Sequence, residues 1–327
     1  MSSLSPEQQL VKYLTDAHSI EEQALTQMKA APKLAGDESL RRAFEEHLVE
    51  TERHEQLVRE RLEAHGADPS RLKDAAGKAG GWGMLLFARS QPDTPGKLVA
   101  HAFSYEHMEL ATYELLSQVA EVAGDEETAA VARSIAAEER RMGERLAEGF
   151  DAAVEASLRK VETDDLDSHL DHYLADAHAL EGQALQLLEA APGLVDDEQL
   201  ATLFRDHLGE TREHERRVAG RLEARGESPS RLKDAALRLG GLNLGAFFGA
   251  QPDTTAKLAG FAYAFENLEI AAYELLRRVA QRAGDGETAK AAEEILVDER
   301  AAARELAASW ERTMRRETAK RASEARL

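Results

Sequence analysis

The chain has 327 residues, of which 43% are hydrophobic, only 5% are aromatic and 8 are proline, a composition typical of an all-helical protein. Its formal net charge of −20 argues against a nucleic-acid partner, because DNA and RNA are polyanions. The absence of cysteine excludes disulfides and thiolate metal sites.

Neither a targeting signal nor a membrane span is expected. Residues 1–9 lack the basic and apolar regions of a signal peptide. The longest apolar run, residues 82–88, is far shorter than the roughly 20 residues that cross a bilayer. We therefore predict a cytoplasmic protein.

Two long helices are predicted before residue 67. The first should open at Ser5, a capping serine followed by proline, and end near residue 31, where Pro32 stops it. The second should begin after the N-cap Asp37 and end just before Gly66. They are joined by a short link.

A long connection, residues 67–96, follows the second helix. It is predicted to hold a short helix near residues 70–79 and an apolar patch at residues 82–87. The patch should pack on its own domain, the alternatives being that it docks a partner, a lipid surface or the sister domain. Its glycines match no phosphate-binding loop, since no strand precedes them.

Two further long helices follow, one starting at Thr94 and one after Gly124. Two short links around one long crossover, between helices 2 and 3, are the connectivity of a ferritin-like four-helix bundle. The sequence thus predicts an all-α domain of this kind.

This pattern occurs twice. His18, in YLTDAHSIE, returns as His178 in YLADAHALE, an offset of 160 residues, and the segment PSRLKDAA at 69–76 returns at 229–236 without a gap. Because so long a period gives each copy a core of its own, we predict two tandem bundles, residues 1–157 and 162–320. A charged tail, residues 321–327, completes the chain.

The second helix carries polar residues on its apolar face. His47, Glu50 and His54, at i, i+3 and i+7, fall within a sector of about 60°. The other helices also bring carboxylates inward at mid-length: Glu21 on the first, Glu106 and Glu109 on the third, Glu139 on the fourth. So many charges can share a dry core only around something positive.

The second copy preserves every member of this inward set, whereas outward charges changed, as Glu52 to Arg212 and Glu138 to Asp298. The predicted metal ligands are Glu21, His47, Glu50, His54, Glu106, Glu109, Glu139, Glu181, His207, Glu210, His214, Glu266, Glu269 and Glu299. His18, Tyr113, His178 and Tyr273 are predicted to support them from outside the first coordination sphere.

Carboxylate and imidazole ligands suit iron or manganese, and a dinuclear centre is a known use of this bundle. We predict a di-iron or mixed iron–manganese centre in each domain. The alternative is a structural or interaction bundle, without metal, whose inward polar groups form a hydrogen-bonded network.

Three segments, FEEHLVET at 44–51, YEHMELATY at 105–113 and Glu138-Glu139, resemble the YciF-like family of bacterial stress-response proteins. The resemblance covers nearly all of each copy. It implies a ferritin-like bundle with a di-metal centre and a tendency to dimerise, so the two fused domains are expected to form an intramolecular pseudo-dimer, with a further homo-oligomer left open.

One feature departs from the ferritin pattern of Glu-x-x-His on the second and fourth helices. The fourth helix reads Glu139-Arg-Arg-Met142, and Ala302 takes the methionine's position in the second copy. Either one metal position is weaker, or Glu106 and Glu109 compensate. The expected function is a stress-associated metal protein that handles oxygen, peroxide or iron.

Overall fold

The computed structural model describes residues 5–67, 94–162, 165–227 and 254–324, and every regular element in these ranges is a helix. Two compact units divide the chain, one containing residues 1–157 and 310–327 and the other residues 158–309. Among the described helices, none is both long enough and apolar enough to cross a bilayer.

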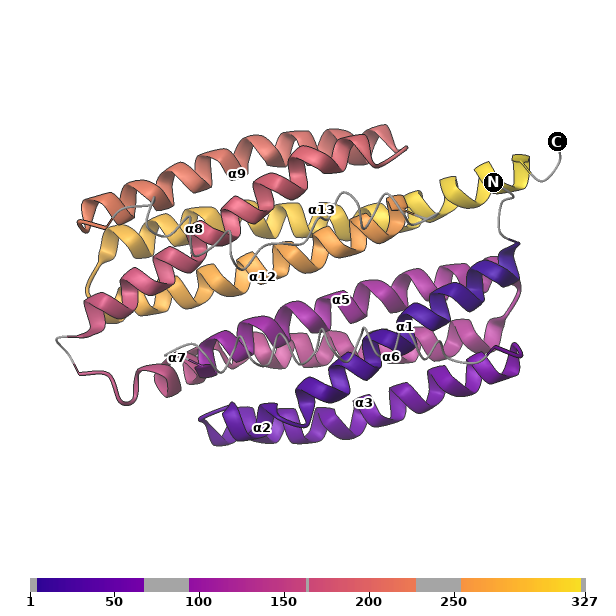
Figure 1. The fold of residues 1–327 in the computed structure, drawn as a ribbon, viewed down its shortest axis with the longest axis horizontal. Coiled ribbons are helices and arrows are strands. Elements are labelled where there is room, and N and C mark those ends of the chain that lie inside the picture. The colour runs from indigo at the N-terminus through magenta and orange to yellow at the C-terminus, as the bar shows by residue number, and fades with distance from the viewer. Residues whose placement is uncertain (1–4, 68–93, 163–164, 228–253, 325–327) are drawn as a thin grey trace. The chain divides into compact units, whose positions relative to one another are not determined.

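The first unit is built on four long helices, which lie side by side in Figure 1. They are α1 (Pro6–Met28), α3 (Glu38–Ala64), α5 (Thr94–Ala123) and α6 (Glu126–Glu148), accompanied by the short α2 (Ala31–Leu34) and α7 (Phe150–Leu158). α1 packs against α3 and α5, and α6 packs against the same two helices. The four therefore close into a bundle.

Ion pairs along α6 define the connectivity of this bundle. Arg61, near the end of α3, meets Asp125 at the start of α6, whereas Arg145, near the end of α6, meets Glu46 early in α3. Since α5 is likewise antiparallel to α6, through Glu114 with Arg140 and Glu121 with Arg133, α3 and α5 run parallel. Parallel second and third helices are the arrangement that the predicted ferritin-like connectivity requires.

The second unit repeats this arrangement. Its elements are α8 (Leu166–Ala190), the 3-10 turn η2 (Ala191–Gly193), α9 (Glu198–Ala224), α12 (Thr254–Arg282) and α13 (Gly286–Glu324). α8 packs against α9 and α12, while Glu293 and Glu294 of α13 pair with arginines of α12 and α9. The predicted fold class, two tandem ferritin-like four-helix bundles, is confirmed.

Local sequence signals set most of the helix ends. Asp37 caps α3 by accepting from the backbone amides of Ser39 and Leu40, and Gly66 follows the end of α3 with a positive φ of 65°. One prediction was wrong: α1 ends at Met28, and Pro32 lies in the first turn of α2. A proline is tolerated there because first-turn amides have no intrahelical partner.

The fourth helix differs between the two copies. In the first it ends at Glu148, with Gly149 as the C-cap, whereas α13 continues through the equivalent Ser309. A Cβ at Gly149 would lie 2.7 Å from the Leu40 side chain, so a larger residue here would displace that side chain. The short helix predicted near residues 70–79 and the apolar patch at 82–87 lie outside the described residues.

The N-cap of α13 provides a test of the fold. Burial alone would raise the pKa of Asp285, but hydrogen bonds from Thr288 and the charge of Arg221 outweigh it and lower the pKa from 3.8 to about 2. A lowered pKa contributes stability that is present above pH 3.8 and is lost as the pH falls toward 2. Asp285→Ala should therefore reduce the free energy of unfolding at pH 7 by about 1 kcal/mol and weaken its decline on acidification.

Urea denaturation followed by circular dichroism at pH 7 and pH 3 would measure both effects. Asp285→Asn keeps a capping oxygen without the charge, so its stability should fall between those of the wild type and the alanine variant. Wild-type stability of Asp285→Ala at pH 7 would contradict this account of the cap.

Candidate metal centre

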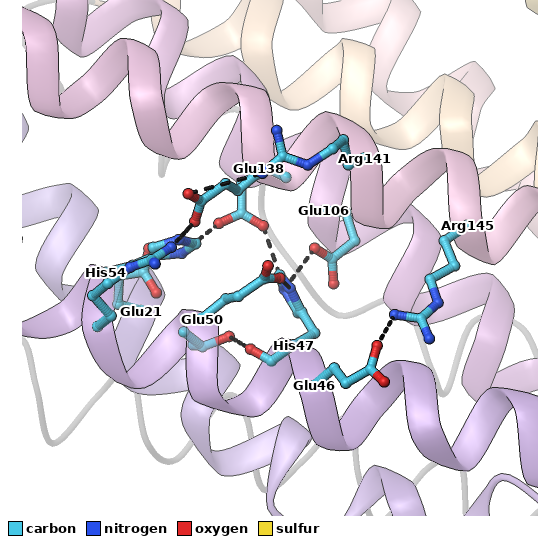
Figure 2. A network of polar contacts seen from close by, with 12 residues as sticks. Glu21, Glu46, His47, Glu50, His54, Glu106, Glu138, Arg141 and Arg145 are labelled. Carbon is cyan, nitrogen blue, oxygen red and sulfur yellow. Dashed lines mark hydrogen bonds and ion pairs between the residues drawn. The ribbon is translucent and has the colours of Figure 1, made fainter.

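Six ionisable side chains converge midway along the first bundle, and none is more than 1% exposed. Every long helix of the bundle contributes, and Figure 2 shows how several of them point toward one another. The six are Glu21 from α1, His47 and His54 from α3, Glu106 and Glu109 from α5, and Glu139 from α6. The predicted inward carboxylates of α1, α5 and α6 therefore meet the two histidines of α3.

These side chains form two adjacent groups, each with ligand atoms within 4.8 Å of one another. The His47 group contains His47, Glu106, Glu109 and Glu139, and the His54 group contains Glu21, His54 and Glu139. Glu139 belongs to both: its Oε1 lies 2.8 Å from His54 Nδ1 and its Oε2 lies 3.4 Å from His47 Nε2. The two oxygens of one carboxylate thus face two separate clusters.

The outward nitrogen of each imidazole is held by a further carboxylate. His47 Nδ1 lies 3.0 Å from Glu50 Oε2, and His54 Nε2 lies 2.6 Å from Glu138 Oε2 (Figure 2). Since a carboxylate only accepts, these outward nitrogens carry protons. The inward nitrogens, Nε2 of His47 and Nδ1 of His54, are thereby directed at the groups.

Two further contacts bear on how the carboxylates are satisfied. Tyr113 donates a hydrogen bond to Glu21 Oε1. By contrast, neither carboxylate oxygen of Glu109 has a hydrogen-bond partner among the described residues. A buried polar group without a partner is costly, so the carboxylate of Glu109 has unused capacity to accept a hydrogen bond or to bind a cation.

The carboxylates of the centre differ in their affinity for protons. Burial raises the pKa of Glu21 to about 8 and that of Glu106 to about 7, and it raises the pKa of Glu109 well above 4.5. Burial acts on Glu139 too, but hydrogen bonds from His47 and His54 outweigh it and lower the pKa to about 2.

Burial acts on the imidazoles in the opposite direction, but their carboxylate neighbours outweigh it. Burial alone would lower the pKa of His54, but Glu139 and its neighbours raise it to about 9, and the pKa of His47 is raised well above 6.5 by Glu106. Protons therefore balance the charge of the centre, and a cation would take their place.

The second bundle reproduces this geometry. Its groups are His207, Glu266 and Glu299, and Glu181, His214 and Glu299, with Glu269 buried beside them. Glu299 Oε1 lies 2.9 Å from His214 Nδ1, and Oε2 lies 3.4 Å from His207 Nε2. The outward partners are Glu210 and Asp298, and Tyr273 donates to Glu181.

Two equivalent pairs of predicted residues, one from each copy, lie outside the two ligand groups of the centre. The side chain of Glu50 is 39% exposed and that of Glu210 is 51% exposed, and each pairs with the outward nitrogen of a neighbouring histidine, His47 or His207. His18 is grouped with Glu22 and Glu55, and His178 contacts Glu215. Sequence phasing could not separate Glu50 from His47, because both lie in the same 60° sector of α3.

Sequence reasoning also missed Glu138 and Asp298, which it treated as outward charges. Their contact with a histidine of α3 joins residues 84 positions apart, so no pattern within one helix contains it. The available signal was chemical: the change from Glu138 to Asp298 between the copies retains a carboxylate.

Comparison with known families gives a match to a family model described as "Domain of unknown function (DUF892)", over residues 5–159 and again over residues 165–319. The first matched range contains the four long helices of its bundle, the second contains those of its bundle except the last residues of α13, and each contains both groups of its bundle. No solved structure matches the chain.

The proton balance of the centre predicts an unusual pH dependence for the metal-free protein. Glu21 and Glu106 have ordinary values of 4.5, and raised values of about 8 and 7 in the fold. A raised pKa contributes stability that is complete below the unfolded value and is lost as the pH rises through the folded one. Chelator-treated protein should therefore lose stability between pH 4.5 and pH 8, and His54 extends this loss toward pH 9.

Denaturant titrations at several pH values would measure this loss. The double variant Glu21→Gln with Glu181→Gln keeps an acceptor for each tyrosine but cannot ionise, so its stability should vary less with pH. Glu46→Gln with Asp206→Asn, on exposed positions, is the control. A stability that stays level or rises from pH 5 to pH 8 would refute the assigned proton balance.

Proposed function

The chain belongs to the DUF892 family, and we propose that each of its two bundles binds a pair of metal ions, iron or iron with manganese, for reactions with oxygen or peroxide or for iron handling. The observation that carries this proposal is the sharing of Glu139 between two groups of buried ligands, repeated by Glu299.

The chemistry of the donor set fits such ions. Each group offers one imidazole and at least two carboxylates, and thiolates are absent from the chain. Oxygen-rich sites with imidazole suit iron and manganese, whereas structural zinc sites favour cysteine. The unpartnered oxygens of Glu109 and Glu269 supply ligand capacity that the protein itself leaves unused.

Each residue has a role that follows from its contacts. Glu139 would be shared by the two ions, His47 and His54 would bind through their inward nitrogens, and Glu21, Glu106 and Glu109 would complete the two sets. Glu50 and Glu138 hold the tautomer and orientation of the histidines. Tyr113 keeps a proton against Glu21 at the edge of the centre.

The fourth helix lacks the histidine of the ferritin pattern, and α3 supplies a second histidine instead. Both imidazoles of the centre come from α3, at positions 47 and 54, so each group contains one although Met142 stands on α6. This supports two comparable metal positions rather than one strong and one weak position.

When bound, the ions would supply the electrons that reduce oxygen or peroxide. The resemblance to YciF-like proteins supports a protective role under stress, and we further propose that the two fused bundles pair within the chain as separate subunits of that family would.

A metal-free structural bundle is the competing function. Direct contacts favour it, since His47 Nε2 lies 3.0 Å from Glu106 Oε2 and His54 Nδ1 lies 2.8 Å from Glu139 Oε1. This alternative requires a melting temperature that chelators do not change, whereas bound metal would raise it by mass action.

Elemental analysis of protein purified without chelators tests the proposal. We expect about two metal ions per bundle, and oxygen uptake when Fe(II) is added in air. Glu139→Ala should remove the metal of the first bundle and Glu299→Ala that of the second, because each loses the shared ligand. Halved metal content in either single variant, with wild-type content in Glu46→Ala, would support the assignment.

Unchanged metal content in both single variants would rule out the assignment. If the wild type contains no metal and consumes no oxygen, the structural bundle is the better description. Circular dichroism of each variant separates loss of ligand from loss of fold.

Glu50 and Glu210 should behave differently from the ligands. Substituting both by glutamine leaves both groups intact but weakens the hold on the histidines, so metal affinity should fall by about 10–100-fold rather than vanish. Competition titration with a metal chelator would measure it. A complete loss equal to that of the Glu139→Ala and Glu299→Ala pair would instead make these residues direct ligands.

A further inference from the structure

A third cluster of ligand side chains lies beside the centre of the first bundle. His18 and Glu22 of α1 and Glu55 of α3 have ligand atoms within 4.8 Å of one another, with His18 Nδ1 3.4 Å from Glu55 Oε1. The imidazole is only 3% exposed and Glu55 only 5%. This is a mixed imidazole and carboxylate set of the kind that binds divalent cations.

This outer cluster adjoins both solvent and the inner centre. Glu55 lines a surface cavity of about 460 Å³, together with Leu25, Glu52, Gln56, Arg59, Glu60 and Glu63. On the inner side, His18 precedes Glu21 by one helical turn and Glu55 directly follows His54. Glu21 and His54 are two of the three members of the His54 group.

The cavity wall has a charge that would attract cations. Four carboxylates and one guanidinium line it, and Arg59 already pairs with Glu55. A metal ion would have to replace this guanidinium, whose side chain is 50% exposed and can move into solvent. Arg59 is thus a competitor for the position.

The second bundle has lost this cluster. Gly182 stands where Glu22 does, and only the contact between His178 and Glu215, at 3.0 Å, remains. The equivalent cavity wall has also changed: Glu52, Gln56 and Glu60 correspond to Arg212, Arg216 and Gly220. Both the third ligand and the acidic surroundings are therefore specific to the first bundle.

We propose that His18, Glu22 and Glu55 form an outer divalent-cation site, which admits metal ions to the first bundle, and that the second bundle lacks it. The site itself is independent of the proposed function, whereas its delivery role rests on the inner centre. The two bundles would consequently load at different rates.

Reciprocal substitutions test the site in the full-length chain. Glu22→Gln removes a charged ligand at a half-buried helical position, and Gly182→Glu restores it where a Cβ meets no atom within 4 Å. Binding of Mn²⁺ is followed by the loss of the free-ion signal in electron paramagnetic resonance.

Glu22→Gln should lower the affinity for one Mn²⁺ ion per chain by about tenfold or more, and Gly182→Glu should add one Mn²⁺ ion per chain. Arg59→Ala should tighten the outer equivalent, since the competing cation is removed.

Glu52→Gln is the matched control, because it removes a charge from the same wall without touching the cluster. An unchanged Mn²⁺ isotherm in Glu22→Gln, or an equal loss in Glu52→Gln, would overturn the site. Slower metal loading of the first bundle in Glu22→Gln supports delivery, and an unchanged loading rate overturns it. The same titration tests the inner centre separately. If Glu139→Ala leaves the Mn²⁺ isotherm unchanged, the inner metal site is refuted, whatever the result for the outer site.

Discussion

The burial of six ionisable side chains in a helical core is the constraint on which each bundle depends. Desolvation penalises every one of them in its charged form. Glu139 stays ionised only because two imidazoles donate to it, and those imidazoles stay protonated only because carboxylates surround them. The centre is therefore cooperative, and each helix is held in register by polar contacts that a misaligned bundle could not form. A cation that replaced the protons would also balance the buried negative charge, and it would give the carboxylate of Glu109 a partner.

Comparison of the two copies shows which residues stay the same at the centre and which change around it. The six core residues, the orienting carboxylates and the tyrosine contact all persist between the copies. Substitution of Glu138 by Asp298 shortens the side chain but keeps an acceptor for the histidine, at 3.2 Å. The cavity wall shows the opposite behaviour, because acidic residues there became arginine or glycine. Contacts inside the bundle are thus constrained by chemistry, whereas the charge at its surface was free to diverge and so to make the two copies different.

The orienting carboxylates link the buried centre to solvent. Glu50 and Glu138 belong to helices that supply ligands, and both are partly exposed. Each histidine therefore connects a dry group of ligands on one side with a hydrated carboxylate on the other. Such a pairing stabilises the imidazolium when no metal is present and strengthens the donor nitrogen when a metal is bound. The same residues thus serve both the fold and the proposed metal site.

The sequence by itself determined the helices, most of their caps, the tandem repeat and the inward set, because caps and 3.6-residue periodicity are local properties. It also placed Glu21, Glu106, Glu109 and Glu139 on core-facing stripes of different helices. Only the tertiary structure decided which of them meet, since the rotation of one helix against another depends on packing. That packing turned Glu50 to the flank of His47, brought Glu138 to His54 across 84 residues, and divided one predicted constellation into two groups that share Glu139. The sequence alone also placed the end of α1 too late. A proline can end one helix or occupy the first turn of the next, and Pro32 does the latter.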